Sequence, residues 1–126
     1  MNNRPSIIPI YTSRGDAAAY LVYPYLYNRS GEWIGWVASN RDVYSVLGHY
    51  VGALSDDPRI LRKRVTGVLK PRLAPPPPPE NKMIPPATVP LPPLMSELTF
   101  SMMDVLLEEP TRLHTIDRGE LKEDMD

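Results

Sequence analysis

The sequence predicts an all-β fold: a small pseudo-symmetric array of repeated β-hairpins, followed by an extended proline-rich arm and a short C-terminal helix. Three observations lead to this prediction. A glycine-punctuated motif recurs in the first half of the chain, with spacings of sixteen and then seventeen residues. Eleven of the sixteen prolines lie between residues 71 and 93. One apolar segment with helical spacing follows the prolines.

The repeat aligns three segments without gaps, namely residues 10–15, 26–31 and 43–48. In each, β-branched and aromatic residues flank a short segment that ends in glycine, and in the first two a polar pair precedes that glycine. This pattern favours a strand, a tight turn and a returning strand. The clearest turn ends at Gly31, because glycine takes positive φ at little steric cost. A small residue follows four positions after each turn glycine, and we expect these residues to line the tight centre of the assembly: Ala19, Gly35 and Gly52.

A fourth unit starts at Arg59-Ile60-Leu61, but it is degenerate. Leu61 replaces the motif's tyrosine, and Val65 stands where the turn glycine belongs. The terminal unit of a repeat array is often atypical. The sequence therefore predicts three clear hairpins and one degenerate one.

The units Leu-Tyr-Asn-Arg-Ser-Gly-Glu-Trp-Ile-Gly-Trp-Val (26–37) and Val-Tyr-Ser-Val-Leu-Gly-His-Tyr-Val-Gly-Ala-Leu (43–54) resemble the repeats of the bacterial four-fold β-flower family. The resemblance covers about residues 7–70. It implies hairpins arranged like petals around a pseudo-fourfold axis. It implies no reaction and no catalytic residues.

The chain is expected to divide into a repeated β-hairpin domain (1–70), a proline-rich arm (71–95), a short amphipathic helix (96–110) and an acidic tail (111–126). The arm favours polyproline II, and its 23 residues from 71 to 93 could span about 70 Å. It serves either as a semi-rigid linker or as a segment in an aromatic-lined groove. Ser101 and Asp104 have capping-box-like spacing and Pro110 stops the helix. The tail from Thr111 is expected to be mobile.

The residue content excludes several kinds of chemistry. No cysteine is present, which excludes disulfides, thiolate metal sites and thiol nucleophiles. His49 and His114 lack partners at metal-ligand spacing, and no phosphate loop or dinucleotide fingerprint is found. We therefore expect no enzyme activity, no cofactor and no metal. With no apolar leader and no bilayer-length apolar run, the sequence favours a cytoplasmic protein, although peripheral association with a membrane complex is not excluded.

The preferred functional hypothesis is an accessory or assembly subunit that docks on a larger protein complex or on copies of itself. Alternation along a strand sends Trp33 and Trp36 to opposite faces, so one of them is expected at an edge or surface, as an anchor or as ordinary packing. The apolar residues of the arm and helix either bind a partner or cover the chain's own β-domain. The predicted partner-binding residues are Trp33, Trp36, Ile84, Val89, Leu91, Leu94, Phe100, Met103, Leu106 and Leu107.

A competing hypothesis starts from charge. Residues 1–72 carry ten Lys and Arg against five Asp and Glu, whereas residues 99–126 carry three against eight. The two ends should attract each other weakly. A basic run beside an aromatic-rich β-domain is typical of nucleic-acid binding. The residues of that run that could contact a nucleic acid are Arg59, Arg62, Lys63 and Arg64.

Overall fold

The computed structural model describes residues 6–65 and 70–116, which form one curled antiparallel sheet with a short helix beside it. The eight strands follow one another around the sheet in sequence order. The all-β prediction is therefore confirmed. The elements are β1 (Ile8–Tyr11), β2 (Ala17–Val22), β3 (Tyr25–Tyr27), β4 (Trp33–Val37), β5 (Asp42–Ser45), β6 (Tyr50–Leu54), β7 (Ile60–Lys63), β8 (Met102–Asp104), α1 (Val105–Glu108) and the 3₁₀ helix η1 (Pro110–Arg112).

The first six strands form three equivalent hairpins, β1–β2, β3–β4 and β5–β6, which we number 1 to 3. Their registers repeat: each has one register shift, just before the position of the motif's tyrosine. The repeat therefore specifies a complete hairpin with its bulge. The small mid-strand residues lie opposite matching apolar residues, in the pairs Ile10 with Ala19, Leu26 with Gly35 and Val43 with Gly52.

The mid-strand glycines meet the backbone of a neighbouring strand, as their position in the repeat predicted. A Cβ on Gly35 would press on the carbonyl oxygen of Tyr44, and a Cβ on Gly52 on that of Leu61. Strands can pack this closely only where the side chain is absent.

Hairpin 4 pairs β7 with β8, although the two strands are far apart in the sequence. Leu61 lies opposite Asp104, and Lys63 opposite Met102. The fourth unit thus begins where the repeat predicted, but its returning strand comes from beyond the arm. The expected domain boundary at residue 70 therefore does not bound the sheet.

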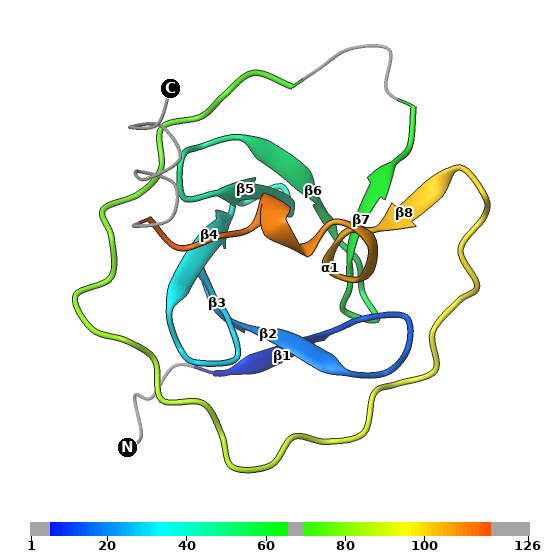
Figure 1. Ribbon diagram of the computed structural model, residues 1–126, viewed down its shortest axis with the longest axis horizontal. Coiled ribbons are helices and arrows are strands. Elements are labelled where there is room, and N and C mark those ends of the chain that lie inside the picture. Colours follow the sequence, from blue (N-terminus) through cyan, green and yellow to red (C-terminus); the bar gives the residue numbers. More distant parts are fainter. Residues whose placement is uncertain (1–5, 66–69, 117–126) are drawn as a thin grey trace.

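Side-chain hydrogen bonds and one backbone hydrogen bond join the first hairpin of the sheet to the last. Asp104 of β8 accepts hydrogen bonds from the amide and the hydroxyl of Ser13, at 2.6 and 2.7 Å. The amide of Tyr11 in β1 donates to the carbonyl of Pro58 at 3.0 Å. Hairpin 4 is thereby fastened to hairpin 1, and the strands surround a common centre (Figure 1).

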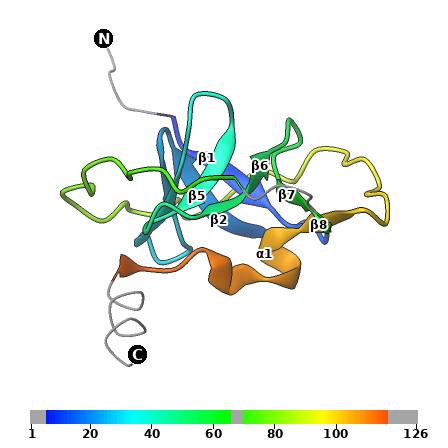
Figure 2. The same cartoon turned by 90° about the horizontal axis from the view of Figure 1, so that it is seen from above.

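The hydrophobic core fills that centre, and the residues after β8 cover one side of it, where Figure 2 shows α1 and η1 on one side of the strands. Val105 of α1 and Leu113 after η1 are buried with the inward-facing strand residues. Leu113 packs over Gly35. The expectation of a mobile tail from Thr111 is therefore wrong for Leu113, because this apolar side chain completes the core. Residues 117–126 lie outside the described part of the chain.

The C-terminal helix is much shorter than the expected range of 96–110. It spans only Val105–Glu108, and the residues before it form β8. Asp104 is its N-cap: the carboxylate accepts a hydrogen bond from the amide of Leu107. The sequence spacing of Ser101 and Asp104 placed this cap three residues too early, because pairing with β7 keeps residues 102–104 extended.

The arm runs around the outside of the hairpins and returns to the sheet at β8 (Figure 1). The view from above shows that the arm lies at the level of the strands and passes around them (Figure 2). It forms no helix or strand. The arm thus binds in cis, to the domain from which it extends.

Candidate protein-interaction surface

Backbone hydrogen bonds hold the arm against two hairpin turns. The amide of Leu73 donates to the carbonyl of Gly48 at 3.0 Å, and the amide of Met83 to that of Gly31 at 2.9 Å. Both turn glycines have positive φ, and a Cβ on either would overlap the carbonyl of the same arm residue. Proline has no N–H to donate. The two hydrogen bonds that arm amides donate therefore fall where the proline runs are interrupted, ten residues apart.

Two tyrosine hydroxyls donate to carbonyls of arm prolines. Tyr25 binds Pro77 at 2.6 Å, and Tyr11 binds Pro90 at 2.7 Å. Aromatic side chains that hydrogen-bond a proline-rich backbone are a recurrent means of recognising polyproline II. We call the four groups on the domain, the carbonyls of Gly31 and Gly48 and the hydroxyls of Tyr11 and Tyr25, the rim site.

The arm contributes little to the hydrophobic core. The core cluster contains strand residues together with Met103, Val105 and Leu113, and no residue of the arm. The arm is therefore held mainly by hydrogen bonds. Only the side of the arm that faces the hairpins contacts the domain.

Burial along the end of the arm repeats every three residues, which is the period of polyproline II. Pro92, Met95 and Leu98 are half-buried, and the residues between them are exposed. The outermost positions carry large apolar side chains: Leu91 is 91% exposed, Leu94 101% and Phe100 92%. With Glu97 these residues occupy every third position from 91 to 100, and we call them the outer row; Phe100 lies in the turn before β8, with Arg64 over its ring.

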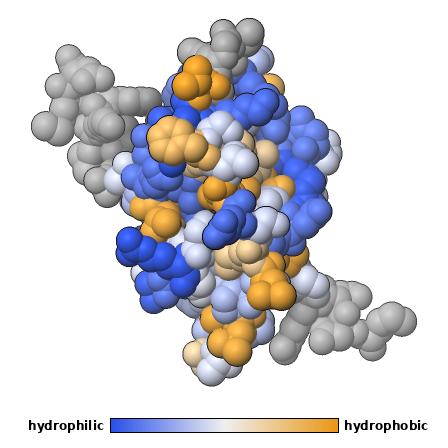
Figure 3. All heavy atoms as spheres, turned by 90° about the vertical axis from the view of Figure 1, so that its right-hand side faces the viewer, coloured by the Kyte–Doolittle hydropathy of each residue, from blue (hydrophilic) through white to orange (hydrophobic). Residues whose placement is uncertain are grey.

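Leu91, Leu94 and Phe100 are exposed, and their binding to a partner stays a prediction. Ile84 is also exposed, at 86%, and Val89 less so, at 36%. Figure 3 shows the side of the molecule on which the arm returns to β8, where hydrophobic side chains reach the surface among hydrophilic ones. Contiguous exposed apolar surface often marks an interaction site.

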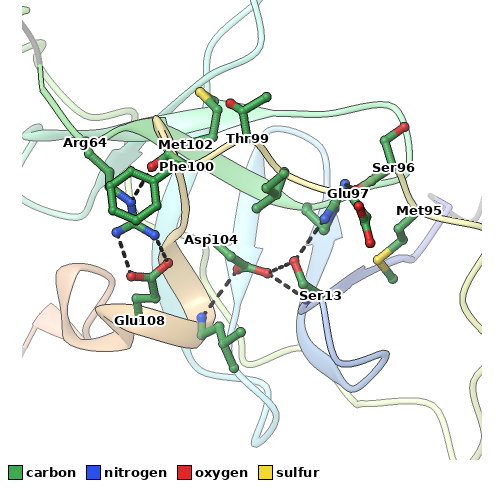
Figure 4. A pocket seen from close by; sticks show the side chains of 13 residues that line it. Ser13, Arg64, Met95, Ser96, Glu97, Thr99, Phe100, Met102, Asp104 and Glu108 are labelled. Atoms are coloured by element: carbon green, nitrogen blue, oxygen red, sulfur yellow. Dashed lines mark hydrogen bonds and ion pairs between the residues drawn. The ribbon is translucent and has the colours of Figure 1, made fainter.

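A cavity of about 520 Å³ lies inside the outer row, where the arm returns to the sheet. Figure 4 shows Ser13, Asp104 and Glu108 in it, with residues 95–102 along one side. Three of its charged residues, Arg59, Arg64 and Glu108, form ion pairs. Arg64 binds both carboxylate oxygens of Glu108, at 2.8 and 2.9 Å. This hydrogen bonding lowers the pKa of Glu108 and raises that of Arg64.

Arg59 is the centre of the buried polar cluster beside this cavity. It is only 2% exposed and binds Asp57 at 2.6 Å, Ser13 at 2.9 Å and the carbonyl of Ser96 at 2.9 Å. The hydrogen bond from Arg59 holds the pKa of Asp57 below its ordinary value of 3.8. The inclusion of Arg59 among nucleic-acid contacts is therefore wrong: its charge joins hairpin 4 to hairpin 1 and to the chain after the arm.

The rest of the basic run does not form one open surface. Arg64 is engaged with Glu108, and Arg62 lies over the ring of Tyr50. Only Lys63, of the four predicted contacts, is exposed without an ion pair in the described part of the chain.

The two tryptophans lie on the same face of β4, contrary to the alternation argument. Trp33 is opposite Tyr27 and Trp36 opposite Tyr25, because the register shift between them inserts one residue. Trp36 is 9% exposed and stacks on Tyr44. Trp33 is half-buried and donates to the carbonyl of Gly35 at 2.7 Å. Both are packing residues of the outer aromatic face, and neither is an exposed anchor.

The remaining predicted residues lie in β8 and in α1. Met103 is buried in the core, so its assignment to partner binding is wrong; β8 places it opposite Arg62 with its side chain inward. Leu106 and Leu107 are half-buried, and Leu106 packs against the core. Leu73, Met83 and the two tyrosines that hold the arm were not among the predicted residues. The interruptions in the proline runs at 73 and 83 were the available signal.

Within residues 6–65 and 70–116, no three His, Asp or Glu side chains lie together in a way that could hold a metal ion. No helix in these two ranges is long and apolar enough to span a bilayer.

Comparison with known families gives one match: the model of the family described as 4-fold beta flower protein matches residues 8–104. The matched range includes the arm and ends with β8, so it coincides with the closed set of four hairpins. Searches of curated proteins and of solved structures found no match.

Proposed function

This chain belongs to the 4-fold β-flower family, and we propose that it is a non-catalytic, cytoplasmic accessory subunit that docks on a larger protein complex through the outer row of its arm. The observation that carries the proposal is the exposure of Leu91 and Leu94 on an anchored segment, with Phe100 exposed in the turn that follows.

The spacing of the outer row suits recognition by a groove. In polyproline II each residue advances about 3.1 Å, so side chains three apart project in the same direction about 9 Å from one another. Leu91 and Leu94 have this relation. A groove with two apolar pockets at that separation would bury both.

The hairpin domain favours such binding by holding the arm in place. A free proline-rich chain must be ordered on binding, and ordering costs affinity. Here Tyr11 binds the carbonyl of Pro90 just before the outer row, and Arg59 binds the carbonyl of Ser96, which lies between Leu94 and Glu97. The segment from 90 to 96 is therefore preorganised, and the domain acts as its scaffold.

Site-specific photo-cross-linking tests the proposal. A photoreactive residue replaces Leu94 in the full chain, and the protein is exposed to a lysate of its own organism. A matched variant carries the same group at Ser39, an exposed residue in the β4–β5 turn away from the arm. We expect a discrete cross-linked protein from position 94 that position 39 does not produce.

The cross-link should also depend on the neighbouring row residues. Leu91→Ser together with Phe100→Ser should abolish it, while the melting temperature changes little because both side chains are exposed. Identical products from positions 94 and 39, or a product insensitive to this double substitution, would contradict the proposal.

A further inference from the structure

We infer that the rim site is a binding site for a proline-rich segment, which the chain's own arm fills in this structure and which the arm of a second copy of this chain can fill. The inference does not rest on the proposed function, because it concerns the inward-facing side of the arm and the hairpins beneath it.

The first support is the chemistry of the contact. The rim site offers acceptors, the carbonyls of Gly31 and Gly48, to amides that interrupt the proline runs. It offers donors, the hydroxyls of Tyr11 and Tyr25, to proline carbonyls. A ligand must therefore be extended and proline-rich, with free N–H groups ten residues apart. This pattern selects a segment such as the arm itself.

The second support is that the arm is separable from the core. None of its side chains belongs to the core cluster, and most of its residues are exposed. Release of the arm would thus leave the core side chains of the hairpins packed against one another. It would also uncover the turns, where the two glycines leave room for an approaching backbone.

The third support is that equivalent hairpins engage the arm in succession. Moving along the arm, Leu73 meets hairpin 3, Met83 meets hairpin 2, and Pro92 lies beside Gly15 of hairpin 1. The site is thus a repeated track and not a single contact.

Competition from the chain's own arm determines when a second copy can bind. A tethered ligand has an effective concentration in the millimolar range, so it excludes weak ligands in trans. Weakening the arm without changing the rim site should therefore open the site. The substitutions Leu73→Pro and Met83→Pro do this, because each removes one N–H donor from the arm and leaves the four rim groups in place.

The experiment measures binding of a fluorescein-labelled peptide with the sequence of residues 70–94 by fluorescence anisotropy. The full-length Leu73→Pro/Met83→Pro variant is compared with the wild type and with a control, Leu91→Pro/Leu94→Pro. The control adds two prolines at exposed positions whose amides donate to no hairpin carbonyl in the described part of the chain. We expect the Leu73→Pro/Met83→Pro variant to bind the peptide about tenfold more tightly than the wild type or the control does, since two hydrogen bonds of the competing arm are lost.

The peptide itself supplies a matched control. A peptide with proline at the positions of Leu73 and Met83 should bind the variant several-fold more weakly. Equal affinities for all three proteins, or for both peptides, would overturn the inference. If the double variant lost its cooperative thermal unfolding, Met83→Pro alone would be used, with the same expected direction.

Exchange between whole chains is tested with complementary variants. The Tyr11→Phe/Tyr25→Phe protein keeps a native arm but lacks the rim donors, whereas the Leu73→Pro/Met83→Pro protein keeps the rim site. Native mass spectrometry of the mixture should show a 1:1 heterodimer. Each protein measured alone should be monomeric. Monomers only, at concentrations where the peptide binds, would show that the arm of a second copy does not reach the site.

Discussion

Replacement of Gly31 by alanine is the most direct test of how the arm is held. The residue has a φ of +84°, and a Cβ there would overlap the carbonyl oxygen of Met83. Gly15 is the matched control, since its φ is +91° but the atom nearest to its added Cβ is Cγ of Pro92 at 3.4 Å, an ordinary contact. Both substitutions strain a turn, and only the one at Gly31 displaces the arm.

The expected magnitudes follow from this difference. A left-handed backbone costs an L-residue about 1–2 kcal/mol, and this cost applies at both positions. At Gly31 the arm must also move, which breaks the hydrogen bond from Met83, worth about 1 kcal/mol. Gly31→Ala should therefore lower the free energy of unfolding by about 1 kcal/mol more than Gly15→Ala does.

Two measurements check this result. Urea denaturation gives the two free energies of unfolding, and hydrogen exchange reports on the amide of Met83. Gly31→Ala should remove the protection of this amide, whereas Gly15→Ala should leave it in place. Equal destabilisation by both substitutions, with the Met83 amide equally protected, would refute the reasoning.

Two further predictions concern the cluster around Arg59. Arg59→Met should lower the free energy of unfolding by about 3–5 kcal/mol, because it leaves Asp57 without its partner; urea denaturation measures this, and a loss below 1 kcal/mol would contradict it. The hydrogen bond from Arg59 lowers the pKa of Asp57 below 3.8, so this carboxylate stabilises the fold above that pH and loses its contribution as the pH falls through the lowered pKa. The urea midpoint should fall with pH below 3.8, and less steeply in Asp57→Asn; equal slopes would rule out this role.

The hairpins could be predicted because they are local and recur. A turn glycine and the strands on either side of it lie within about a dozen residues, so the pattern around Gly31 carries the whole unit. The second strand of hairpin 4 could not be found in this way. Met102–Asp104 has neither the aromatic residues nor the turn glycine of the motif, and its pairing with β7 depends on the path of the arm.

The details that were missed have physical causes. The faces of Trp33 and Trp36 follow from one inserted residue, because a register shift cancels the alternation between them. The position of the arm depends largely on backbone carbonyls, such as that of Gly31, which leave no pattern in the side chains. The exposure of Leu91 and Leu94 could be suspected from composition. To predict it, however, one must know both the three-residue period of the arm and which side of the arm the hairpins cover.

The long interval between the strands of hairpin 4 has a consequence for synthesis of the protein. Forty residues lie between Lys63 and Asp104, and at about 5–20 residues per second the ribosome needs roughly 2–8 s to make them. During that time the edge of β7 has no partner from its own hairpin, and open strand edges are templates for aggregation. The nascent chain is thus most vulnerable to aggregation in the seconds before its last strand emerges.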